Sequence, residues 1–270
     1  MHDRHTNREK YFEEQSKTTE KYVIPFINEV KHINKETSVL EIGCGEGGNL
    51  LPFHKAGCKR IVGVDLSKGK IKNANKFFES MENFNNIEFI LDNIYNLNAE
   101  EIGQFDIIIT RDVLEHIHRQ EKFMSFVKKF MKPDGKFFLG FPPWYNPFGG
   151  HQQICENKYL SRLPYFHLLP GFIYKFILKL FGETKAKIEG LLEVKQTGIS
   201  IERFEQILKK VNYKKDKRTF YFINPNYEIK FGLKPRKACR LITSIPFVRN
   251  FFITTSYYLI SMNEILTSKK

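Results

Sequence analysis

The stretch VLEIGCGEGGNLLPFHKAGCKRIVGVDLS, residues 39–67, decides the fold class. Two short apolar runs, at 38–43 and 60–65, each end where a loop begins, which is typical of buried parallel strands. Between them, a glycine-rich loop leaves backbone without Cβ atoms beside the start of a helix, and amide groups at such a place bind nucleotide-like ligands. The glycines stand at positions 43, 45, 47 and 48. The stretch therefore predicts a ligand-binding strand–helix–strand unit.

Further apolar runs at residues 87–93, 105–111 and 136–142 alternate with helical patterns. This alternation predicts an α/β fold with a doubly wound, mostly parallel sheet. Two β-rich runs, at 219–223 and 251–262, are expected to complete the sheet. The pattern divides the chain into an N-terminal helical segment (1–37), a ligand-binding core (38–141), an insertion (142–199) and a C-terminal completion of the sheet with a basic segment (200–270).

Two acidic residues narrow the choice of ligand. The glycines satisfy both GxGxG and the dinucleotide pattern GxGxxG, so they do not decide it. Asp65 ends the second run, where a carboxylate accepts hydrogen bonds from ribose hydroxyls of either kind of cofactor. Glu41 precedes Gly43 by two residues, and its negative charge is expected to repel a pyrophosphate and attract a cation. The two acidic residues favour a positively charged, phosphate-free adenosine compound as the ligand. The alternative is a dinucleotide ligand, which would make the protein an NAD(P)-dependent oxidoreductase.

Over residues 38–142 these motifs resemble those of the class I S-adenosylmethionine-dependent methyltransferases. The matching stretches are, in order, EIGCGEG (41–47), GVDLS (63–67), LDN (91–93), FDIIITRDVLEHI (105–117) and KPDGKFFLGFP (132–142). The resemblance implies a Rossmann-like sheet of seven strands whose last strand runs antiparallel. It also implies S-adenosylmethionine as the cofactor.

The cofactor site implied by the resemblance has eight residues in this chain: Glu41, Gly43, Gly45, Asp65, Leu66, Asp92, Asn93 and Arg111. The glutamate is expected to face the amino end of the cofactor, and the two glycines its methionine part. The carboxylate of Asp65 is expected to hold the ribose. That of Asp92 is expected to accept a hydrogen bond from the adenine amino group, beside Asn93. No metal is expected.

Two histidines are candidates for the general base that removes a proton from the methyl acceptor. His116 follows the run at 105–111, where members of the family place groups that face the substrate. His151 lies in the loop after 136–142, which could fold over the same cleft. Either ring could instead be a hydrogen-bonded structural residue. We expect transfer to an oxygen or nitrogen atom of a small-molecule, glycan or lipid-linked acceptor.

The insertion over 142–199 is rich in aromatic residues, proline and glycine, and is expected to form a lid over the acceptor. Its residues 171–181 have apolar side chains at helical spacing, and these are predicted to pack on the main domain. They are Phe172, Ile173, Phe176, Ile177, Leu180 and Phe181. Shallow membrane contact through 171–181 is the alternative. The prolines and lysines of this stretch argue against a bilayer span.

The net charge of the chain is +13, and +9 of it falls between Lys209 and Arg240. A solvated lysine-rich face is the simpler interpretation, and an RNA or other nucleic-acid methyltransferase is the alternative. A nucleic-acid partner is not favoured, because Phe141 stands where amino methyltransferases of the Pro-Pro-aromatic type need a side chain that accepts a hydrogen bond. The opening residues lack the apolar run of a secretory signal, so a cytoplasmic location, with membrane association left open, is expected.

Overall fold

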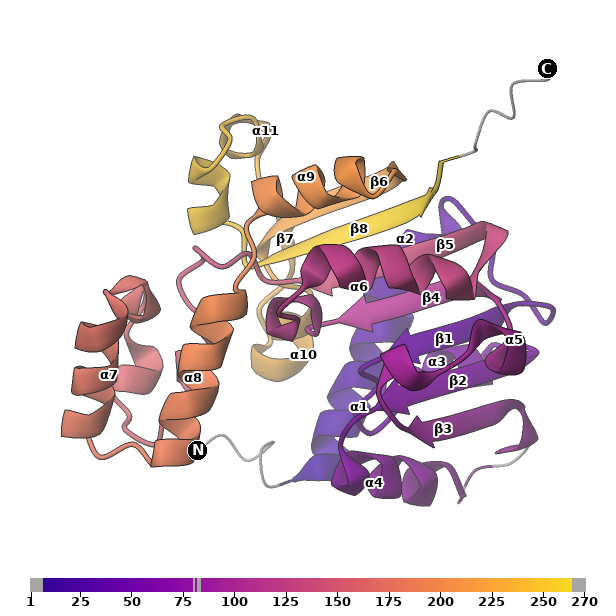
Figure 1. Cartoon of the computed structure of the whole chain (residues 1–270), viewed down its shortest axis with the longest axis horizontal. Helices are drawn as coiled ribbons and strands as arrows, with labels where there is room; N and C mark the ends of the chain where they lie inside the picture. The colour runs from indigo at the N-terminus through magenta and orange to yellow at the C-terminus, as the bar shows by residue number, and fades with distance from the viewer. Residues whose placement is uncertain (1–6, 80, 82–83, 264–270) are drawn as a thin grey trace.

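The apolar runs of the core form neighbouring strands of one sheet in the computed structural model, which describes residues 7–79, 81 and 84–263. The strand order is β3-β2-β1-β4-β5-β8-β6-β7, and β1 to β5 pair in parallel (Figure 1). The parallel strands are β1 (Ser38–Ile42), β2 (Arg60–Asp65), β3 (Ile87–Leu91), β4 (Phe105–Arg111) and β5 (Met131–Phe141). Their carboxyl ends therefore meet at one edge of the sheet.

The C-terminal part of the chain completes the sheet, as predicted. Strand β8 (Thr255–Met262) lies between β5 and β6 (Tyr213–Ile223) and is antiparallel to both. The expected antiparallel last strand is thus confirmed. It begins at Thr255, so residues 251–254 of the predicted run lie before the strand. The sheet has eight strands within the described residues, one more than the seven expected. The additional strand is β7 (Arg236–Lys237), whose two residues pair with β6.

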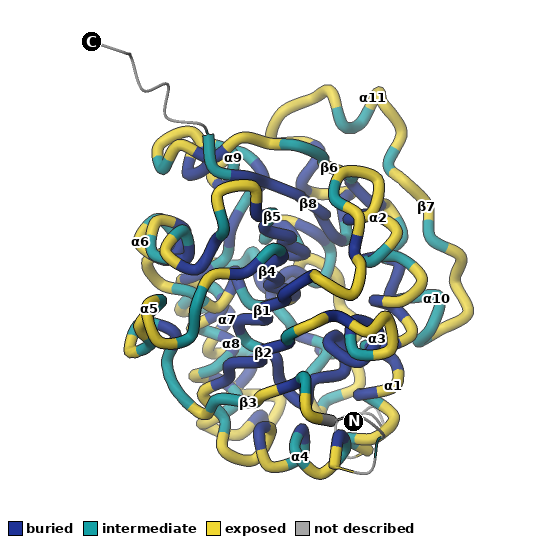
Figure 2. The backbone as a smooth tube through the Cα atoms, turned by 90° about the vertical axis from the view of Figure 1, so that its right-hand side faces the viewer, coloured by how far each residue is buried: buried dark blue, intermediate teal, exposed yellow. Residues whose placement is uncertain are grey.

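Helices cover both faces of the sheet, and Figure 2 shows the three layers end-on. One core lies between the sheet and the N-terminal helices, whose aromatic side chains point inward. The other lies between the sheet and helices placed later in the chain. On the first face are α1 (Arg8–Thr18), α2 (Ile24–Asn28), α3 (Leu51–Lys55) and α4 (Lys68–Glu79); on the second are α5 (Ala99–Ile102), α6 (Gln120–Val127) and α9 (Ile201–Lys210).

Local chemistry explains where several of these elements end. A π-helical turn over Thr19–Val23 joins α1 to α2 just before Pro25, which has no N–H to donate. Residues 132–135 form a bulge inside β5, where the register against β4 shifts. Two short helices, α10 (Asn226–Phe231) and α11 (Arg240–Thr243), lie in the basic segment.

The insertion after β5 has a core of its own and contains α7 (Gly171–Leu180) and α8 (Lys185–Thr197). The predicted packing of α7 is wrong. Tyr174 and Leu178 are its buried residues, and they face the core of the insertion, whereas Phe172, Phe176, Leu180 and Phe181 are exposed. No helix within the described part of the chain is long and apolar enough to cross a membrane.

The buried ring of His167 packs against residues near the start of the insertion. His167 is fully buried, and its ring lies edge-on to the indole of Trp144, with centroids 4.6 Å apart. Burial lowers the pKa of His167 to about 4, so the neutral ring donates from Nε2 to the carbonyl oxygen of Trp144 at 2.8 Å. A Cβ atom added at Gly150 would lie 2.1 Å from the Cβ of His167. Only glycine fits there without displacing the ring.

Replacing Gly150 by alanine is expected to destabilise the protein by about 1–3 kcal/mol, the usual cost of overpacking a filled site. The matched control is Gly190→Ala in α8, where an added Cβ meets no atom within 4 Å. That change is expected to stabilise by about 0.5–1 kcal/mol, because alanine favours a helix over glycine. Urea denaturation of both variants measures the difference, and equal effects at the two positions would contradict this account of the insertion.

Candidate functional site

The glycine-rich loop lies at the carboxyl end of β1 in a conformation that favours glycine. Gly43, Gly45 and Gly47 have φ angles of +77°, +58° and +80°. The amide groups of Gly43 and Cys44 both donate to the carbonyl oxygen of Val64, at 2.7 and 3.1 Å, which docks the loop on the end of β2. A Cβ atom added at Gly45 would meet no atom within 4 Å, because it would project into open space.

Asp65 connects this loop to the next one. Its carboxylate accepts hydrogen bonds from the amide groups of Gly45 and Ser67, both at 2.9 Å. Its side chain is nine-tenths buried, yet it lines the same cavity as Gly45. The predicted carboxylate at the end of the second strand is therefore held beside the glycine-rich loop.

A cavity of about 890 Å³ opens at this edge of the sheet. Its size lies within the range of about 300–1,000 Å³ typical of small-molecule sites. Of the residues expected to bind the cofactor, it is lined by Gly43, Gly45, Asp65, Leu66, Asp92, Asn93 and Arg111, and it is also lined by His116. The open backbone at Gly45, next to the carboxylate of Asp65, is a place where an adenosine-type cofactor fits without meeting a side chain.

Glu41 differs from its expected place. It does not line the cavity but is fully buried in β1, where Asn49 donates to its Oε1 at 2.6 Å. Burial raises the pKa of Glu41 to about 8, although the hydrogen bond from Asn49 and the nearby Arg111 oppose the shift. The raised pKa weakens the argument that the charge of Glu41 repels a pyrophosphate.

The remaining predicted residues form contacts of their own around the cavity. Asp92 accepts from the side-chain amide of Asn96 at 2.7 Å, and Asn93 accepts from the amide of Tyr95 at 3.1 Å, so both also hold the turn after β3. Arg111 ends β4 and donates to Asn49 at 2.8 Å.

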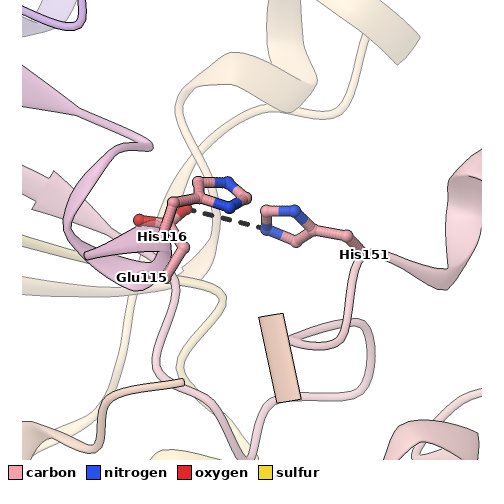
Figure 3. Close-up of side chains that lie close together, drawn as sticks. All are labelled: Glu115, His116 and His151. Atoms are coloured by element: carbon pink, nitrogen blue, oxygen red, sulfur yellow. Dashed lines mark ion pairs between the residues drawn. The ribbon is translucent and has the colours of Figure 1, made fainter. Parts of the chain in front are cut away.

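The two predicted histidines meet, together with a glutamate that sequence reasoning missed. His116 and Glu115 lie in a 3-10 turn after β4, and His151 reaches them from the insertion (Figure 3). The two rings are 5.0 Å apart, and Nε2 of His151 lies 3.6 Å from Oε1 of Glu115. Burial lowers the pKa of His151, but the carboxylate of Glu115 outweighs it, so the pKa is raised overall.

Residues 33–163 match the family model described as a methyltransferase domain. These residues, just under half of the chain, are similar to a methyltransferase domain. The predicted recognition as an S-adenosylmethionine-dependent methyltransferase of class I, and the predicted cofactor of that family, are confirmed.

Two curated relatives match only parts of this chain. The mitochondrial ubiquinone biosynthesis O-methyltransferase of Dictyostelium discoideum is 29% identical over 111 residues, which cover 38% of this chain and 34% of the relative. The mRNA cap guanine-N(7) methyltransferase of Candida glabrata is 35% identical over 88 residues, which cover 29% of this chain and 21% of the relative. The chain thus spans about a third or less of the length of these relatives.

Solved structures share the fold over nearly the whole chain. The magnesium protoporphyrin IX methyltransferase ChlM of Synechocystis PCC 6803 with bound SAH has a TM-score of 0.54 at 16% identity, and the match covers 93% of this chain and 84% of that one. The plantazolicin methyltransferase BpumL with SAH and a triazolic desmethylPZN analogue has a TM-score of 0.56 at 14% identity, and the match covers 95% of this chain and 88% of that one.

The sheet of the methyltransferase domain also argues against the NAD(P) alternative. A dinucleotide-binding sheet continues in parallel beyond its fifth position, with the order 3-2-1-4-5-6. Here the antiparallel strand β8 stands next to β5 instead. The sheet order therefore separates the two classes where the glycine spacing did not.

Sequence reasoning missed one wall of the cavity in the methyltransferase domain. Arg8, Tyr11 and Gln15 of α1 line it, at a spacing that places them on one helical face. Arg8 donates from Nε to the buried carboxylate of Glu46 at 2.7 Å, which fastens α1 to the glycine-rich loop. The spacing of these polar side chains was the available signal, but it does not reveal what the helix covers.

Replacing Glu41 by glutamine is expected to make the stability of the ligand-free methyltransferase less dependent on pH. The unfolded chain ionises this carboxyl near 4.5, whereas the folded protein keeps the proton to about pH 8. Rising pH between these values therefore favours the unfolded state of the wild type. In urea denaturation, the free energy of unfolding of E41Q should therefore increase relative to that of the wild type as pH rises through this window. Glu36→Gln, at an exposed position, is the control. A difference in the free energy of unfolding between E41Q and the wild type that does not change with pH would contradict the raised pKa of Glu41.

Proposed function

We propose that this chain transfers a methyl group from S-adenosylmethionine to a hydroxyl oxygen of a small, lipophilic acceptor. The observation that carries the proposal is the single cavity lined at once by the glycine-rich loop, by Asp65 and by His116. A donor held at the loop and an acceptor held near His116 would share one cavity. Enclosure and alignment of the two reactants supply much of the catalysis of an in-line displacement.

The side chains near His116 suit a hydroxyl acceptor. A hydroxyl must lose its proton as its oxygen attacks the methyl group, and this needs a nearby group that accepts or displaces the proton. Glu115, His116 and His151 gather such groups at one place. The O-methyltransferase named among the relatives is in keeping with this choice.

The exposed face of α7 supports a lipophilic or lipid-linked acceptor. Phe172, Phe176 and Leu180 are 77%, 64% and 69% exposed, and no acidic residue occurs in the helix. Lys175 and Lys179 are exposed beside them. An apolar face flanked by lysines matches the surface of a membrane with anionic lipids, because the aromatic rings enter the interface while the ammonium groups meet the headgroups. We therefore place this face against such a membrane.

The function is tested with the purified chain, labelled S-adenosylmethionine and a cell extract divided into lipid and aqueous fractions. We expect a labelled O-methylated product in the lipid fraction, identified by mass spectrometry. The variant Asp65→Ala should bind S-adenosylhomocysteine about 10- to 150-fold more weakly, since hydrogen bonds to a charged group contribute about 1.5–3 kcal/mol. Binding of the cofactor without labelled product in either fraction would identify a binding module and contradict the proposed enzyme. A labelled nucleic acid would contradict the acceptor.

Membrane contact is tested by co-sedimentation with phosphatidylcholine vesicles that contain or lack phosphatidylglycerol. We expect binding to the anionic vesicles, and we expect Phe172→Ser with Phe176→Ser to weaken it at least about tenfold, which corresponds to about 1.4 kcal/mol. Phe222→Ser, which replaces an exposed aromatic residue of β6, is the control. A dimer in solution that the double variant dissolves, without vesicle binding by the wild type, would show instead that a second copy covers this face.

A further inference from the structure

Three side chains with metal-binding atoms meet beside the cavity. One ligand atom each from Glu115, His116 and His151 lie within 4.8 Å of one another. The first two belong to the 3-10 turn after β4, and His151 comes from the insertion, so residues 35 positions apart in the chain converge (Figure 3). His116 also lines the cavity, which places the cluster at the edge of the space for the two reactants.

The buried carboxylate of Glu115 has no hydrogen-bond partner among the described residues, and its ion-pair partner is the ring of His151. The residue is 2% exposed, and neither carboxylate oxygen has a hydrogen-bond partner among the described residues. Nε2 of His151 is 3.6 Å away, which is too far for a hydrogen bond. Burying a carboxylate without hydrogen bonds is costly, and the ring of His151 at ion-pair distance is the cationic partner that offsets its charge when protonated. A metal ion would take that role with both histidines neutral.

The backbone on both sides of the cluster is held in an unfavourable conformation. Asp112, which directly follows β4 and precedes the turn, has a φ angle of +55°, and His151 has a φ angle of +58°. Such conformations cost a non-glycine residue about 1–3 kcal/mol and gather at functional sites. At His151 the strained backbone directs the ring toward Glu115 and His116 (Figure 3).

We propose that Glu115, His116 and His151 bind a divalent transition-metal ion. Two imidazole groups and one carboxylate are a donor set suited to zinc, cobalt, manganese or ferrous iron. Magnesium and calcium prefer oxygen ligands throughout, so this set disfavours them. Three protein ligands leave at least one coordination position open, as in catalytic rather than structural sites.

The ion would activate the acceptor, and this part rests on the proposed function. A hydroxyl oxygen bound to the open position loses its proton to water more readily, because the ion stabilises the oxyanion. The oxygen then forms a bond to the methyl carbon while the carbon–sulfur bond breaks. The electron pair of that bond stays on sulfur, which becomes the neutral thioether of S-adenosylhomocysteine. Water takes the proton of the acceptor, so charge and atoms balance.

The site is tested by adding cobalt(II) to the full chain after treatment with a chelator. We expect one equivalent to bind, with visible absorption that reports nitrogen and oxygen ligands. The variants His151→Ala and Glu115→Gln should weaken binding at least about tenfold. The exposed His32→Ala is the control and should bind like the wild type. Titration with S-adenosylhomocysteine shows that each variant is folded, because neither His151 nor Glu115 lines the cofactor cavity.

The outcomes separate this inference from the proposed function. Failure of the wild type to bind cobalt, or equal binding by His151→Ala, would overturn the metal site even if methyl transfer occurs. Stoichiometric binding that the two ligand variants abolish would support the site even if no acceptor is found. Where transfer is measured, treatment with the chelator should lower it and zinc or cobalt should restore it. Transfer that is unchanged by the chelator would overturn the catalytic role of the ion.

Discussion

The carboxylate of Asp65 is the point on which the cofactor side of the site depends. It accepts the amide hydrogens of Gly45 and Ser67, which belong to the loops after β1 and after β2. One buried charge thus fixes the separation of two loops, and hydrogen bonds to a charged acceptor are about twice as strong as neutral ones. The parallel register of β1 and β2 brings both loops to the same edge of the sheet, so Asp65 acts on a geometry that the sheet has already set.

The features that the sequence predicted well are local ones. The strands from β1 to β5 follow from short apolar runs, and the glycine-rich loop follows from residues that must adopt positive φ angles. The charge of Glu41 was not predictable in this way. Its pKa depends on full burial between neighbouring strands and on Asn49, and a stretch of sequence does not state how much water its side chains keep. The wall of the cavity formed by α1 was not predicted either, because the spacing of its polar side chains does not show which part of the protein they face.

The insertion shows a second limit of periodicity. Helix α7 has apolar side chains on two sides, since Tyr174 and Leu178 are buried while Phe172 and Phe176 are exposed. The spacing predicted the helix correctly, but it could not decide which apolar side has a partner within the chain. That choice depends on α8 and on the core of the insertion, which form from residues on both sides of α7 in sequence.

The place where the insertion joins the main domain is also the place where the cluster forms. Thr197, at the end of α8, donates to the backbone oxygen of Glu115, and the amide of Gln120 donates to the backbone oxygens of Leu114 and Thr197. The turn that carries Glu115 is therefore held by the far end of the same insertion that supplies His151. Because both ends of the insertion meet at this turn, a change in how the insertion sits on the domain would move His151 relative to the turn. The geometry at the acceptor end of the cavity thus depends on the insertion, while the cofactor end depends on the sheet.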